Sequence, residues 1–276
     1  MSTQVLQARS RQVSATGSVA RAAKGLAGPG IVSGLLGGMF LALTMMIVMG
    51  ASGMGFASAI NLGMPAFVYT ITPPLQMLPS LMAGMGISLP STAMSQLSAA
   101  IHSGHISAAM AKQFGGMLLS MHVPMAKVQM MGLIMTGHAT NATVTTLMSQ
   151  MTPAARASVM ATMPLNAGHM AVGLALHFAF SAFLGLAFFA VLGAIAWNGR
   201  SVLRSRAAVA FLGMIGGATV YFVMRFGLLP STNPMMGFVP QIAFFLAHLL
   251  FGLVVGLGFS LALRSRSVST EFPTVN

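Results

Sequence analysis

The chain lacks aspartate and cysteine, and its single acidic residue is Glu271. Without paired carboxylates it has no acid–base pair, no carboxylate to orient a catalytic histidine and no two-metal carboxylate site. Without cysteine it has no disulfide framework, thiolate nucleophile or cysteine metal site. A phosphate-binding Gly-Lys-Ser/Thr loop is also missing. These absences predict that the protein is not an enzyme, unless a bound cofactor supplies the chemistry.

Charge of either sign is scarce. Only 5% of the 276 residues are charged and 56% are hydrophobic, whereas about a quarter of the residues in a soluble domain are charged. The net charge of +12 does not indicate a nucleic-acid-binding surface, because the basic residues lie in gaps between apolar runs. The composition predicts an all-α integral membrane protein whose partner is the lipid bilayer, with no nucleic-acid partner.

Four apolar runs have about the 20 residues or more that a membrane-crossing helix needs. They cover residues 31–49, 170–197, 207–228 and 241–263. We therefore divide the chain into a basic arm (1–30), a first transmembrane helix (31–49), a methionine-rich insertion (50–168), three further transmembrane helices (169–263) and a tail (264–276).

The insertion is apolar on average, but prolines interrupt it repeatedly, and proline stops or kinks helices. We interpret it as short helices packed on the membrane surface. The alternative is that its two most apolar pieces, residues 59–72 and 114–135, add a pair of spans and give six in total.

Basic residues predict the orientation. Nine of the 13 Lys and Arg residues fall on one side of a four-span scheme: four in the arm, together with Arg200, Arg204, Arg206, Arg264 and Arg266. Because cytoplasmic loops are enriched in Lys and Arg, we expect both termini in the cytoplasm, and the insertion and residues 230–240 outside it. The expected location is the bacterial inner membrane.

The spans suggest a duplicated helical hairpin. Two sets of residues recur at identical spacing. The glycine set of the first span is repeated in the third: Gly34, Gly37, Gly38 and Met45 become Gly213, Gly216, Gly217 and Met224. The histidine set of the second span is repeated in the fourth: His177, Ser181 and Gly185 become His248, Gly252 and Gly256. Each half would be an outgoing glycine helix followed by a returning histidine helix. The alternative is that small residues four apart simply let membrane helices approach closely.

His177, His248 and Arg225 form the candidate ligand-binding set. Each histidine is the eighth residue of its span, about 10 Å below the membrane boundary. One hypothesis is a shared site, in which both rings ligate haem or bind a quinone. The alternative is that each ring bonds a backbone carbonyl or Ser181 and fastens two helices. Arg225 lies one turn from the end of the third span, where it could pair with an anionic lipid or ligand.

The 27 methionines suggest a metal hypothesis. Met117, Met121, His122 and Met125 follow closely in the insertion, and thioether with imidazole ligands suits Cu(I). The alternative is that methionine serves as adaptable packing material.

Three classes of function follow from the sequence. The first is a membrane subunit or binding protein for copper or a lipid-like ligand, with other membrane subunits as partners. The second is a small transporter built from duplicated hairpins. The third is a haem- or quinone-linked electron carrier.

Overall fold

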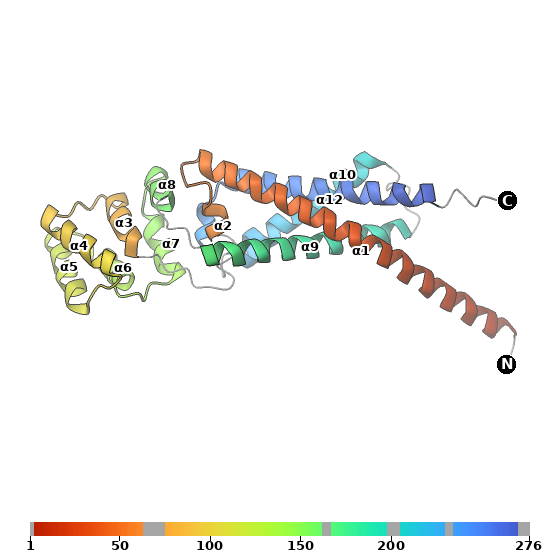
Figure 1. The fold of residues 1–276 in the computed structure, drawn as a ribbon, viewed down its shortest axis with the longest axis horizontal. Coiled ribbons are helices and arrows are strands. Elements are labelled where there is room, and N and C mark those ends of the chain that lie inside the picture. Colours follow the sequence, from red (N-terminus) through yellow and green to blue (C-terminus); the bar gives the residue numbers. More distant parts are fainter. Residues whose placement is uncertain (1–2, 63–74, 162–166, 198–204, 230–233, 270–276) are drawn as a thin grey trace. The chain divides into compact units, whose positions relative to one another are not determined.

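A computed structural model describes residues 3–62, 75–161, 167–197, 205–229 and 234–269. All regular secondary structure in these ranges is helical (Figure 1). Within them, four helical segments are long and apolar enough to cross a membrane, as the sequence predicted: Gly25–Ala51, Ala167–Ile195, Arg206–Leu228 and Gln241–Ser265.

The first long helix, α1 (Thr3–Ala51), joins the basic arm to the first span without a break. Pro29 lies inside it, although proline removes one backbone hydrogen bond from a helix. The apolar span begins at Gly25, several residues before the start that the sequence predicted. The arm is therefore a helical extension of the first span.

The other spans are α9 (Ala167–Trp197), α10 (Arg206–Phe222) with its π-helical continuation η4 (Val223–Leu228), and α12 (Gln241–Ser269). Large apolar side chains stand exposed along all four spans, including Val32, Leu36, Phe40, Ile47, Phe183, Val191, Phe211, Ile215, Ile242, Leu246 and Leu261. Surfaces this apolar suit lipid rather than water. The chain is therefore a multi-pass membrane protein.

The chain divides into two compact units. The first comprises Met1–Leu41, His177–Phe222 and Phe245–Asn276, and the second comprises Ala42–Leu176 and Val223–Phe244. With four spans, the connections after the first and third spans leave the membrane on the same side. Both of these connections belong to the second unit.

Short helices make up the insertion. They are α2 (Ser58–Leu62), η2 (Leu75–Met77), α3 (Leu78–Gly84), α4 (Ser91–Ser103), α5 (Ala108–Ser120), α6 (Met125–Met135), α7 (Asn141–Ser149) and α8 (Pro153–Ala161). Prolines stand within one residue of the starts of α3, α4, α6 and α8, where a missing N–H costs little. Residues 114–135 are split between α5 and α6, so this piece is not a span. Most of 59–72 lies outside the described residues.

Helices α3 to α8 pack on one another. Helix α3 contacts α6 and α8, and α6 contacts α5 and α7. Their buried side chains include Leu81, Leu97, Leu118, Met131, Leu147, Met148, Val159 and Met160. The insertion therefore has an apolar core of its own, which the sequence did not predict. Several of its methionines are packing material, as one of the two interpretations proposed.

Candidate functional site

In the first hairpin, α1 and α9 meet at glycines. A methyl group on Gly34 would lie 3.0 Å from the Cα of Gly185 and would collide with the carbonyl oxygen of Ser181. Only a residue without a side chain permits this approach.

The second hairpin repeats this contact between α10 and α12. A methyl group on Gly213 would lie 3.0 Å from the Cα of Gly256 and would collide with the carbonyl oxygen of Gly252. Gly213, Gly252 and Gly256 are the repeat equivalents of Gly34, Ser181 and Gly185. The helix contacts thus follow the sequence repeat residue by residue, which supports duplication.

Phenylalanine and glycine also join the two hairpins reciprocally. A methyl group on Gly37 in α1 would lie 2.9 Å from the ring of Phe251 in α12. One on Gly216 in α10 would meet the ring of Phe188 in α9. Each hairpin therefore inserts an aromatic ring against a glycine of the other.

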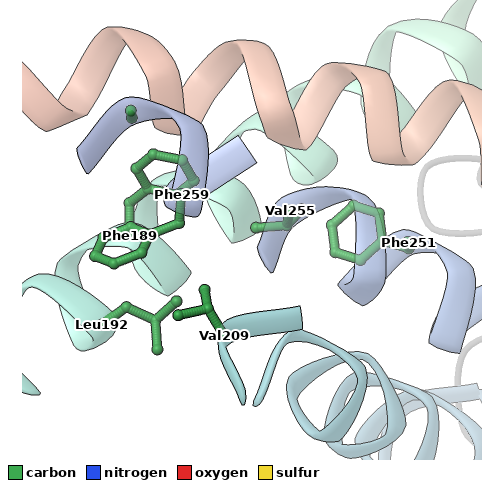
Figure 2. Close-up of a cluster of buried hydrophobic side chains, with 7 residues drawn as sticks. Phe189, Leu192, Val209, Phe251, Val255 and Phe259 are labelled. Atoms are coloured by element: carbon green, nitrogen blue, oxygen red, sulfur yellow. The ribbon is translucent and has the colours of Figure 1, made fainter. Parts of the chain in front are cut away.

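Beside these contacts lies the apolar core of the first unit (Figure 2). In it, Phe189 and Phe259 pack edge to face with ring centroids 5.1 Å apart. No motif in the sequence had singled out these phenylalanines. Their contacts depend on how the two hairpins meet, and spacing along one helix does not reveal that.

His177 binds within its own hairpin. Its Nε2 lies 2.8 Å from the carbonyl oxygen of Gly38, so the ring donates its Nε2–H across the α9–α1 contact. The side chain of Ser181 also lies against Gly38. This hydrogen bond is the one expected if His177 fastens two helices by bonding a backbone carbonyl. Haem ligation through Nε2 would require the bond to break.

His248 also lies within its own hairpin, where it is 4% exposed. Its ring packs edge to face on Tyr221 of α10, with centroids 5.8 Å apart. Its backbone carbonyl lies against Gly217, the equivalent of Gly38. The sequence motifs did not include Tyr221, although it stands one helical turn after Gly217 and so shares its face.

The structure thus places a different neighbour beside each histidine. A ligand shared by His177 and His248 stays a prediction. Arg225, the third candidate residue, belongs to the second compact unit. It lies in the π-helical turn η4, and its Nε is buried without a hydrogen-bond partner among the described residues.

The four candidate copper ligands lie along the corner between α5 and α6. Met117 is half-buried in the last turn of α5, and Met121 caps its end. Met125 begins α6. Met121 and Met125 are 37% and 55% exposed, and His122 between them is also exposed. Among the described residues, no group of three or more His, Cys, Asp or Glu could hold a metal ion, so any site here depends on thioethers.

His122 has a left-handed backbone, with φ of 60°. It ends α5 in a Schellman motif: its N–H bonds the carbonyl of Leu119, and that of Val123 bonds the carbonyl of Leu118, both at 3.0 Å. Three of the other short helices in the insertion end with the same pair of bonds, and each has glycine at this position: Gly86, Gly104 and Gly137. The α5 corner therefore has histidine where its three counterparts have glycine.

The fold and contacts define a class: a polytopic membrane protein with two packed glycine–histidine hairpins and a helical insertion. Comparison of the chain with models of known protein families, with characterised proteins and with solved structures found no match. The function is therefore inferred from the chemistry of the chain's own residues.

Proposed function

We propose that the protein is a non-enzymatic membrane protein of the bacterial inner membrane that binds Cu(I) through its insertion, on the extracytoplasmic side. The hairpins anchor the protein, and the α5–α6 corner supplies the ligands. Met117, Met121 and Met125 offer three thioethers, and His122 offers an imidazole. Soft sulfur ligands with imidazole suit Cu(I).

The single observation that carries this proposal is the left-handed backbone of His122. A residue with a side chain in this conformation costs about 1 kcal/mol relative to glycine. Histidine is nonetheless one of the residue types enriched there. Strained positions concentrate at ligand sites, and this one holds an exposed imidazole between two exposed thioethers.

Methionine exposure supports the same corner. Elsewhere in the insertion, Met77, Met82, Met131, Met148 and Met160 are at most 2% exposed. They fill the core. Core packing explains Met121 and Met125 less completely, because these residues are 37% and 55% exposed.

The test is Cu(I) titration of the full-length protein in detergent, under reducing conditions and against a chromophoric competitor. Replacing Met117, Met121 and Met125 by Leu and His122 by Gly should abolish binding. His122→Gly alone should weaken binding without lowering the thermal midpoint, because glycine relieves the left-handed backbone. Loss of copper in this variant therefore cannot be attributed to unfolding.

A matched control replaces core methionines. The double variant Met131→Leu/Met148→Leu removes two buried thioethers and should retain Cu(I) binding. The proposal fails if the unmodified protein does not bind Cu(I). It also fails if the core variant loses copper as completely as the corner variant.

A small transporter is the second candidate, and one observation favours it. The equivalent contacts of Gly34 and Gly213 support a duplicated hairpin, and duplications of this kind occur among transporters. Reconstituted protein should then move a solute across a vesicle membrane, and absence of flux across a solute panel would remove this candidate.

A further inference from the structure

We propose that Arg225 and Arg156 form, around η5 (Pro234–Phe238), a binding site for a phosphate group carried by an anionic phospholipid or present as free phosphate. This site is independent of the copper proposal. Both arginines and η5 belong to the second compact unit.

The two guanidinium groups approach consecutive residues of η5. Nη1 of Arg225 lies 3.8 Å from the position that a methyl group on Gly237 would occupy. The guanidinium carbon of Arg156, on α8, lies 5.0 Å from the centroid of the Phe238 ring. Arg156 in the insertion and Arg225 near the end of the third span therefore bring two positive charges to one short helix, although they lie far apart in the sequence.

The chain has almost no carboxylate that could neutralise these charges. It has no aspartate, and its only acidic residue, Glu271, follows the fourth span. None of the residues that the structure describes is therefore acidic. An anion from outside the chain is therefore the available counter-charge.

Arg225 also has a donor ready for such an anion. Its Nε is buried and has no hydrogen-bond partner among the described residues. An unsatisfied buried donor is costly, and guanidinium donors bind phosphate oxygens in a bidentate geometry. A phosphate oxygen is thus a fitting acceptor at this position.

Comparison of the two repeated hairpins shows that the arginine in a π-helical turn is specific to the second hairpin. Met45 and Met224 are equivalent in the repeat and both are buried. The next residue is Met46 in the regular helix α1, but Arg225 in the π-helical turn η4. Single π-helical turns occur frequently at functional sites. The second half of the chain therefore departs from the repeat at this position, where it has both an arginine and a π-helical turn.

The depth of Arg225 fits a lipid headgroup. It stands three residues before Leu228, the last residue of the third span, which places it about 4.5 Å inside that end. A guanidinium at this depth can reach the headgroup region while its stem stays in the apolar layer.

The experiment measures binding to the full-length protein by native mass spectrometry and by thermal shift in a zwitterionic detergent. The probes are phosphatidylglycerol, phosphatidylcholine and inorganic phosphate. We expect phosphatidylglycerol to bind and to raise the thermal midpoint. Arg225→Gln and Arg156→Gln should each weaken its affinity about tenfold. Arg225→Lys keeps the charge but removes Nε, and should weaken binding to a smaller extent.

The control is Arg206→Gln. Arg206 is exposed at the opposite end of the same span, so its loss changes the net charge equally without touching η5. If phosphatidylglycerol binds and inorganic phosphate does not compete with it, the site is a lipid site. If phosphatidylglycerol and inorganic phosphate bind with equal affinity, the site is a free-phosphate site. The proposal is overturned if neither binds, if phosphatidylcholine binds as tightly as phosphatidylglycerol, or if Arg206→Gln weakens binding as much as Arg225→Gln.

Discussion

The two hairpins share their backbone contacts but differ in the chemistry beside their histidines. Gly34 and Gly213 each meet the returning helix at the same repeat position. His177 donates to a backbone carbonyl. His248 packs on Tyr221, and the residue equivalent to Tyr221 in the first hairpin is Ala42. Close helix approach constrains every atom near the crossing, and side chains beyond it have more room to differ. The comparison teaches that the glycine contacts define the scaffold and the side chains beside them vary between the two halves.

The largest expected effect comes from filling the glycine contacts. Gly34→Val and Gly213→Val should each destabilise the protein by about 3 kcal/mol, because the new Cβ would meet backbone atoms, which cannot rotate away. Thermal unfolding in detergent measures this change. The control is Gly28→Val, since a methyl group on Gly28 would have no neighbour within 4 Å. If one hairpin tolerates valine and the other does not, the two contacts are not equivalent.

A moderate effect should come from the reciprocal phenylalanine contacts. Gly37→Ala should destabilise the protein, and Phe251→Leu should partly restore it by withdrawing the ring. The same should hold for Gly216→Ala with Phe188→Leu. We expect a coupling energy of about 1 kcal/mol for each pair, measured by a double-mutant cycle.

A second phenylalanine on α9 provides the control for these cycles. Phe183 is 61% exposed, so Phe183→Leu should not restore Gly216→Ala. Zero coupling between Gly216 and Phe188 would show that the ring does not occupy this contact.

The smallest effect should come from the histidines. His177→Phe removes the donor to Gly38 and should cost about 0.6 kcal/mol, the average for hydrogen bonds between membrane helices. His177→Gln keeps a donor and should cost less. His248→Phe retains an aromatic ring beside Tyr221, so the edge-to-face contact should survive this substitution.

The double variant distinguishes separate contacts from a shared site. If each histidine acts within its own hairpin, the effects of His177→Phe and His248→Phe on stability should add to within about 0.5 kcal/mol. A visible absorption spectrum and ligand content of the purified variants complete the test. Loss of one common ligand in both single variants, with no further loss in the double variant, would establish the shared site.

Much of the fold could be predicted because membrane insertion depends on composition and length. The four spans were placed to within a few residues, except that the first begins at Gly25 and its helix extends back to Thr3. Prolines marked where the short helices begin. The packing of α3 to α8 could not be predicted, because their apolar residues indicate burial without indicating which helix covers them.

The candidate sites likewise have one part that could be predicted from the sequence and one part that could not. The sequence placed Met117, Met121, His122 and Met125 close together simply because they are neighbours in the chain. It did not reveal the left-handed backbone of His122, which depends on how α5 ends. Nor did it reveal Arg156 near the element that Arg225 approaches, since that juxtaposition joins segments separated by two spans.

By itself, the sequence determined the all-helical membrane class, the four spans and the repeated glycine and histidine positions, because these depend on local hydrophobicity and spacing. The tertiary structure alone decided which atoms those positions meet. Gly38 receives the hydrogen bond of His177, Gly37 and Gly216 receive rings from the opposite hairpin, and η5 lies beside two arginines. These pairings depend on helix-to-helix geometry, and the periodicity of a single helix gives the contacting face but not its partner.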